Sequence, residues 1–287
     1  MKIAALQMVS TPDVARNLEA ARRLIAQAAA QGAQLVALPE YFCLLGRHDT
    51  DKLSVAETPL CEVGERPAAG IATQRAPIQQ ALADAAREHR LWLIGGTVPL
   101  RTADPQRVRN SNCVFAPDGS LAARYDKMHL FCFDNGKERY DEGRVLEAGD
   151  VPQAVQCDDF RVGLSVCYDL RFPELYRALM EPPCDLIAVP SAFTHTTGAA
   201  HWELLLRARA VENQAYVIAP AQGGTHQNGR RTWGHSMIVD PWGEVLGVLP
   251  EGEGVVLAEV DLERIAAVRR QLPALEHRRL RGVDRVD

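Results

Sequence analysis

The sequence predicts an α/β fold in which two β-sheets pack face to face, helices cover their outer faces, and one domain holds both. Two observations lead to this prediction. Short apolar runs alternate with amphipathic helical patterns, as in strands joined by helices. The order strand, helix, strand, helix, strand, hairpin also occurs twice along the chain, although the two halves share little sequence. An internal structural duplication is the simplest explanation of this recurrence.

The elements of the first half follow from periodicity and turn signals. Strands are expected at 2–8, 35–38, 91–97, 112–116 and 121–125, and helices at 14–28 and 77–89. The first helix is capped by Thr11-Pro12-Asp13 and ended by Gly32, and the last two strands flank a hairpin turn, PDGS, at 117–120. The polar stretch 41–76 is expected to be a loop or lid.

The second half repeats this order. Strands are expected at 160–166, 186–189, 216–221, 235–240, 244–249 and 255–260, and helices at 173–180, 201–213 and 262–280. Pro173 opens a helix at no cost, because its missing N–H would have had no partner there. The last strand and helix form an arginine-rich tail at about 255–287, and the whole chain, 1–287, is expected to be one domain.

Composition excludes several classes of protein. The chain has 287 residues, 47% hydrophobic and 24% charged, which is typical of a globular protein. A formal net charge of −5 offers no basic excess for nucleic acid or an anionic membrane, and no apolar run is long enough to cross a bilayer. The segment 1–8 is too short for a signal peptide, so a cytoplasmic location is expected.

The seven cysteines are scattered, and none forms a C-x-x-C pair. An odd, scattered set is typical of reduced thiols, and the absence of zinc-ligand spacing argues against a metal site. Cys167 differs from the others because it ends an apolar run and precedes a turn that leads into a helix. Free N–H groups and the helix dipole at such a place are expected to lower its pKa and could hold an oxyanion. The alternative is that Cys167 is a buried small apolar residue, as most free cysteines are.

Glu40 and Lys127 stand at positions that correspond to that of Cys167, because each directly follows an expected strand. Strand ends on one side of a sandwich converge in space. A thiol needs a base to remove its proton and a cation to stabilise negative charge, and a carboxylate and an ammonium supply both. Each residue alone is weak evidence, since surface glutamates and lysines are common.

Three motifs, LPE at 38–40, KMHLF at 127–131 and CYDLRFPE at 167–174, resemble the signatures of the nitrilase superfamily of carbon–nitrogen hydrolases. The resemblance covers nearly the whole chain and implies a four-layer α-β-β-α sandwich. It implies that Glu40 is the general base, that Lys127 stabilises the tetrahedral intermediate and that Cys167 attacks. A further family glutamate matches Glu142, which would hold Lys127 or position substrate; the alternative is a solvated loop glutamate.

Within the superfamily, the chain is most similar to the Nit branch, which contains the amidase of deaminated glutathione and the ω-amidase. The similar segments are 197–203, 207–210, 234–243 and 269–273, and segments 219–224 and 277–279 favour the first activity. The loop 131–140 departs from the family, which often carries a Pro-Gly element there. Because this loop is expected to rim the pocket, its departure from the family leaves the identity of the substrate open.

Four residues are expected to bind substrate: Tyr168, Arg171, Phe193 and Thr194. The backbone N–H of Tyr168 would share the oxyanion with Lys127. The Arg171 guanidinium could meet a substrate carboxylate bidentately, and the alternative is a surface salt bridge with Glu174.

The residues 201–203, at the start of an expected helix, are assigned to packing or capping rather than catalysis. His129 could face the site or be a core histidine that the backbone satisfies, and His235 is assigned to buried structure.

The function predicted is therefore that of a thiol amidohydrolase that cleaves the amide C–N bond of a small carboxylate-bearing amide without a cofactor, with deaminated glutathione as the favoured substrate. The alternatives are an ω-amidase acting on α-ketoglutaramate, an N-carbamoyl amidase, and a catalytically silent binding protein on the same fold. The resemblance also implies a homodimer or higher homo-oligomer. The expected helix 173–180 offers a route, because Leu175, Tyr176 and Leu179 give it an apolar surface.

Overall fold

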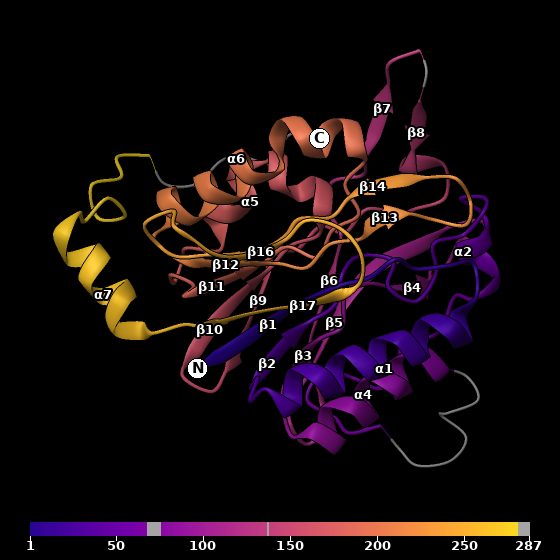
Figure 1. Cartoon of the computed structure of the whole chain (residues 1–287), viewed down its shortest axis with the longest axis horizontal. Helices are drawn as coiled ribbons and strands as arrows, with labels where there is room; N and C mark the ends of the chain where they lie inside the picture. The colour runs from indigo at the N-terminus through magenta and orange to yellow at the C-terminus, as the bar shows by residue number, and fades with distance from the viewer. Residues whose placement is uncertain (68–75, 137, 281–287) are drawn as a thin grey trace.

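The computed structural model describes residues 1–67, 76–136 and 138–280. Two sheets lie face to face, with helices on the outer face of each (Figure 1). This confirms the predicted α/β sandwich. The expected lid residues 68–75, the loop residue Lys137 and the tail residues 281–287 lie outside the described part of the chain.

The first sheet has the strand order β17-β1-β2-β3-β5-β4, with β6 paired to β5. Its strands are β1 (Lys2–Gln7), β2 (Leu35–Ala37), β3 (Trp92–Ile94), β4 (Val98–Arg101), β5 (Val108–Phe115), β6 (Leu121–Asp126) and β17 (Gly254–Glu259). The neighbours β1, β2 and β3 run parallel, whereas β5 and β6 form an antiparallel hairpin. Helices α1 (Val14–Ala30) and α4 (Pro77–His89) cover the outer face of this sheet, below it in Figure 1.

The second sheet has the order β16-β15-β12-β11-β10-β9. Its strands are β9 (Gln153–Cys157), β10 (Phe160–Leu164), β11 (Leu186–Ala188), β12 (Tyr216–Ala219), β15 (Ser236–Val239) and β16 (Val245–Leu249). Again three neighbours, β10 to β12, are parallel and an antiparallel hairpin follows. Helices α5 (Pro173–Ala178) and α6 (His195–Asn213) cover its outer face. The matching strand orders agree with a duplicated architecture, and a duplicated origin stays a prediction.

The remaining elements are short or peripheral. They are α2 (Asp51–Ser54), the hairpins β7 (Cys132–Asp134) with β8 (Arg139–Asp141) and β13 (Gly223–Thr225) with β14 (Arg231–Trp233), the 3-10 helices Glu142–Arg144 and Cys167–Arg171, and α7 (Leu262–Gln271). Within residues 1–67, 76–136 and 138–280, no helix combines the length and the apolar character needed to span a bilayer.

The strand β1 shows why the sandwich forms. Side chains alternate between the two faces of a strand. Ile3 and Ala5 accordingly lie in the core between the sheets, while Ala4 and Leu6 lie in a second core beneath α1 and α4. Both faces of β1 are thus apolar and buried, as expected for a central strand covered on both sides.

Three expectations are wrong in detail. Helix α6 begins at His195 with Thr194 as its N-cap, so residue 201 lies within the helix rather than at its start. Helix α7 ends at Gln271, where Pro273 prevents continuation, rather than at 280. Tyr176 is fully buried, and Leu175 and Leu179 are nearly so, within the chain's own core. These three side chains are not available as a dimer surface.

Candidate active site

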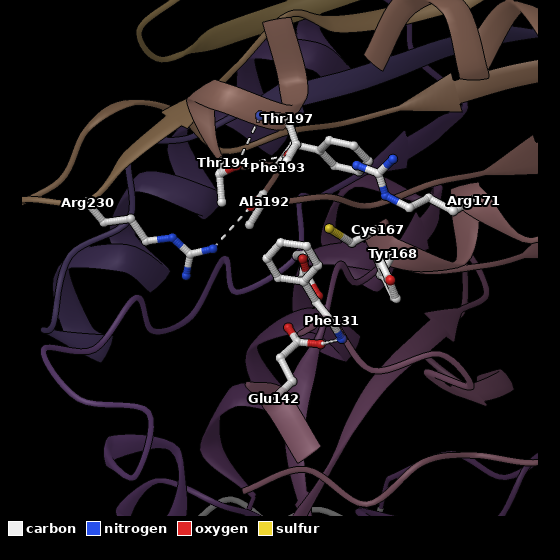
Figure 2. A pocket seen from close by; sticks show the side chains of 11 residues that line it. Phe131, Glu142, Cys167, Tyr168, Arg171, Ala192, Phe193, Thr194, Thr197 and Arg230 are labelled. Atoms are coloured by element: carbon white, nitrogen blue, oxygen red, sulfur yellow. Dashed lines mark hydrogen bonds between the residues drawn. The ribbon is translucent and has the colours of Figure 1, made fainter. Parts of the chain in front are cut away.

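Three strand ends place Glu40, Lys127 and Cys167 beside one pocket. Glu40 follows β2 and Lys127 follows β6 in the first sheet, whereas Cys167 follows β10 in the second. The empty space among the pocket's lining residues is about 290 Å³, which includes the part open to solvent. Figure 2 shows its lining, which is Glu40, Phe131, Glu142, Cys167, Tyr168, Arg171, Ala192, Phe193, Thr194, Thr197 and Arg230. The site therefore lies where the two sheets meet.

Lys127 is buried between two carboxylates. Its Nζ donates to Glu40 Oε1 at 2.9 Å and to Glu142 Oε2 at 2.8 Å. Burial by itself would lower the pKa of Lys127, but the charges of Glu142 and Glu40 outweigh burial and raise this pKa above its ordinary value. The side chain is therefore a fixed ammonium at physiological pH.

Glu40 is almost completely buried and is held from three sides. Its Oε1 accepts from Asn110 Nδ2 at 2.9 Å as well as from Lys127, and its backbone carbonyl accepts from Gln222 Nε2 at 3.1 Å. Burial raises the pKa of Glu40 above its ordinary value, although the Lys127 ammonium opposes the rise. A carboxylate with a raised pKa is a stronger base than an exposed one, which suits proton transfer near neutral pH.

Glu142 lies on the other side of Lys127. Its Oε2 accepts from Lys127 and from the backbone N–H of Phe131 at 2.8 Å, and its Oε1 accepts from the Tyr41 hydroxyl at 2.7 Å. Although burial would raise the pKa of Glu142, the Lys127 ammonium and the Phe131 N–H lower it. Glu142 therefore stays ionised and fixes the ammonium in place.

Cys167 lies on a tight turn between β10 and α5. Its φ is 51°, in the left-handed region, and its backbone N–H donates to Pro190 O at 2.9 Å. The side chain is buried, and burial together with the Glu40 charge raises the pKa of the thiol well above its ordinary value. The expected lowering of this pKa is wrong, because desolvation and the neighbouring carboxylates outweigh the Lys127 ammonium and the Ala192 N–H, which both lower it. The thiol rests neutral and needs a base.

The four expected substrate-binding residues all line the pocket. The Arg171 guanidinium lies over the rings of Tyr168 and Phe193, at 5.8 and 5.4 Å from their centres, and its Nη1 is 3.3 Å from His201 Nδ1. Within the described residues, Arg171 makes no ion pair with Glu174 or any other carboxylate. Its charge thus faces the pocket without an acidic partner.

Phe131 lines the pocket and belongs to the loop 131–140, which was expected to rim it, whereas sequence reasoning missed Ala192, Thr197 and Arg230 in the lining. Thr197 and Thr194 lie at the N-terminus of α6, and their hydroxyls are 2.9 Å apart. Arg230 comes from the β13–β14 hairpin, for which the sequence offers only the turn signal of Asn228-Gly229. Nothing in the local pattern indicates that this hairpin folds over the pocket.

Trp202, expected to pack, is buried against Phe193 at 4.9 Å between ring centres, and its Nε1 donates to His235 O at 2.8 Å. His235 is only half-buried and stacks on Trp233 at 4.1 Å.

Comparison with known proteins gives one matching family and many relatives. The family described as Carbon-nitrogen hydrolase matches residues 2–270. The chain is 41% identical over 279 residues to the deaminated glutathione amidase of Synechocystis sp., covering 96% of this chain and 97% of that one. It is 38% identical to the omega-amidase of Xenopus tropicalis, covering 97% and 95% of the two chains. The crystal structure of the Caenorhabditis elegans NitFhit protein superposes with a TM-score of 0.85 at 37% identity, covering 97% of this chain and 65% of that one.

Proposed function

The chain belongs to the carbon–nitrogen hydrolase family and is a hydrolase of non-peptide amide C–N bonds. We propose that its substrate is a small carboxylate-bearing amide, with deaminated glutathione favoured, and that Cys167 forms a thioester with the acyl group. The mechanism rests on Glu40 and Cys167, which line one pocket, and on Lys127, which donates to Glu40. The 41% identity to a deaminated glutathione amidase supports the substrate.

In the first step, Glu40 takes the proton of the Cys167 thiol as the sulfur attacks the amide carbon. The carbonyl oxygen becomes an oxyanion, which the Lys127 ammonium and the Tyr168 N–H stabilise. Protonated Glu40 then gives its proton to the leaving amine, the C–N bond breaks, and a thioester remains. The raised pKa values of both groups suit this order, because the thiol loses its proton only as the bond forms.

In the second step, Glu40 takes a proton from water, and the resulting hydroxide attacks the thioester. The second oxyanion collapses with loss of the sulfur, which recovers its proton from Glu40. Glu142 acts on neither step directly. It holds Lys127 at 2.8 Å so that one ammonium serves both oxyanions. Apart from the substrate and the attacking water, these steps use only side chains and backbone groups of the chain, without a cofactor.

Two alternatives share this chemistry. An ω-amidase acting on α-ketoglutaramate is the first alternative, and the 38% identity to an omega-amidase supports it. An N-carbamoyl amidase would release CO₂ after hydrolysis. A catalytically silent binding protein is disfavoured by a complete set of nucleophile, base and cation.

The test is turnover of deaminated glutathione, α-ketoglutaramate and an N-carbamoyl amino acid by the purified protein, followed by amine, ammonia or CO₂ release. Deaminated glutathione should give the highest kcat/KM. Faster turnover of α-ketoglutaramate would move the assignment to the ω-amidase. Stoichiometric binding without turnover of any amide would favour the silent binding protein.

We also propose one domain over 1–287, a cytoplasmic location and a homodimer. Leu204 and Val211 are 67% and 48% exposed on one face of α6, and Val211 lies beside Gly243, which follows the 54% exposed Trp242. This apolar surface replaces helix 173–180 as the basis for pairing. A monomer by light scattering at micromolar concentration would contradict the dimer.

A further inference from the structure

We propose that Arg230 binds an anionic group on the leaving amine, so that the pocket suits amides that carry a negative charge on both sides of the scissile bond. This inference rests on the proposed function and narrows its substrate class. It assigns the carboxylate of the acyl half to Arg171 and that of the amine half to Arg230.

The two arginines flank the nucleophile. Figure 2 shows Arg171 and Arg230 on opposite sides of the pocket, with the sulfur of Cys167 between them. They come from unrelated elements, the turn after β10 and the β13–β14 hairpin. A substrate whose carbonyl carbon reaches Cys167 would therefore extend toward one arginine on its acyl side and toward the other on its amine side.

The hydrogen-bonding capacity of Arg230 is largely unused. Its Nη2 donates to Ala192 O at a long 3.4 Å, its guanidinium lies 4.9 Å from the centre of the Tyr140 ring, and its Nε is buried with no partner. Within the described residues, no carboxylate lies within 4.0 Å of it. A guanidinium has five donors in a planar fork that fits a carboxylate bidentately. A buried donor without a partner is costly, so a bound carboxylate would remove that cost.

The hairpin that carries Arg230 is held in position before substrate arrives. The backbone N–H of Arg230 donates to Asn228 Oδ1 at 2.9 Å, and Asn228 Nδ2 donates to Gly46 O at 2.6 Å. At the base of the hairpin, the ring nitrogens of His226 lie 2.9 Å from Ser10 O and 2.7 Å from Thr232 Oγ1. Because the backbone of the hairpin is already held, only the Arg230 side chain has to be ordered when a carboxylate binds, which favours affinity.

The arrangement separates two classes of amide. A primary amide such as α-ketoglutaramate releases ammonia and places nothing charged against Arg230. Deaminated glutathione releases cysteinylglycine, whose terminal carboxylate lies on the amine side. The structure therefore favours N-substituted amides with an acidic amine half.

The test compares deaminated glutathione with its analogue in which the glycine carboxylate is a neutral carboxamide. Both share the acyl half and the scissile bond. Wild type should prefer the acid, and Arg230→Gln should lower the ratio of the two kcat/KM values about 10- to 100-fold, mainly through KM. The control is Arg231→Gln, which removes the exposed neighbouring arginine whose Nη2 is 4.0 Å from Glu251. It should leave the ratio unchanged.

An Arg230→Gln protein that is folded by circular dichroism and keeps the wild-type ratio would overturn the inference while leaving the proposed function intact. A wild-type ratio near one would also overturn it, even if the variant failed to fold. Arg230→Lys, which keeps the charge and loses the fork, should give an intermediate ratio. No hydrolysis of either compound or of α-ketoglutaramate by wild type would instead contradict the proposed function.

Discussion

The Asp169 carboxylate accepts two hydrogen bonds from His129, one from its backbone N–H at 3.0 Å and one from its ring Nδ1 at 2.7 Å. The other oxygen of Asp169 accepts from the Tyr125 hydroxyl at 2.7 Å and from Val166 N–H at 2.8 Å. Asp169 belongs to the turn of Cys167, and His129 follows Lys127 by two residues. This carboxylate therefore links the turn of Cys167, which follows a strand of one sheet, to the segment of Lys127, which follows a strand of the other.

Asp169→Asn should weaken this connection. The amide keeps the size of the carboxylate but cannot accept at both former oxygens, so the two donors at one oxygen lose their partner. The free energy of unfolding should fall by about 1–3 kcal/mol, measured by urea denaturation. kcat should fall more than KM changes, because Lys127 shifts relative to Cys167. The exposed Asp159→Asn is the control and should match wild type in both measurements.

Cys167→Ala should abolish turnover, with a loss on the order of 10⁶-fold as for other covalent nucleophiles, while the protein stays folded. The measurement is product release by a purified sample whose thermal unfolding matches that of wild type. Cys132→Ala removes an exposed thiol outside the pocket and should retain activity. Substantial activity in a folded Cys167→Ala protein would rule out the thioester mechanism.

Lys127→Arg should be nearly inactive. The variant keeps the charge, but a wide planar guanidinium cannot occupy the buried space of an ammonium that lies 2.9 and 2.8 Å from two carboxylates. We expect kcat to fall by about 10²- to 10³-fold, as when an oxyanion partner is lost. Lys2→Arg, on the surface, is the control. Near-normal turnover would mean that Lys127 contributes only charge.

Glu142→Gln should move the acid limb of kcat/KM. The rate requires ionised Glu40, so activity falls as pH drops through the pKa of Glu40, which burial raises above 4.5. The Glu142 charge is one cause of that raised pKa, and removing it should lower the pKa of Glu40 and shift the limb to lower pH. kcat should also fall by about 100-fold, because Lys127 loses a positioning partner. The profile of the exposed Glu88→Gln should not move, and an unmoved limb in Glu142→Gln would contradict the assignment of Glu40 as the base.

Arg171→Lys should discriminate between substrates. For an acidic amide, loss of the bidentate fork should raise KM strongly, with a smaller fall in kcat. For a neutral amide such as propionamide, kcat/KM should change little. Equal losses on both substrates would mean that Arg171 supports its turn, for example through His201 at 3.3 Å, and that another group binds the carboxylate.

The parts of the fold that local sequence dictates were predictable. Helix α4 has the expected bounds, because Pro77 occupies its first turn and Arg90 ends it in the left-handed conformation. The start of α6 was not predictable, because its first turn lacks the periodic apolar residues that mark a helix. A Cβ on Gly198 there would lie 2.3 Å from Trp233, so this turn is set by packing against a distant strand.

The candidate site also has one part that local sequence predicts and another part that it does not. Glu40, Lys127 and Cys167 were predictable because each lies just past a strand and within a short motif, and both properties can be read from the surrounding residues. The contact of Tyr41 with Glu142, the position of Arg230 and the raised pKa of Cys167 depend on segments far apart in the sequence that meet only in the folded chain. No local pattern carries that information.

The pairing of β1 with β17 has a consequence for synthesis. Lys2 lies opposite Glu259, and the carbonyl of Glu40 is held by Gln222. In a nascent chain from which β17 and Gln222 have not yet emerged, one edge of the first sheet is unpaired and Glu40 lacks its support. Long-range pairing of this kind slows folding and exposes strand edges to other chains. Molecules stalled on the ribosome after the first half should therefore be inactive and should depend on chaperones.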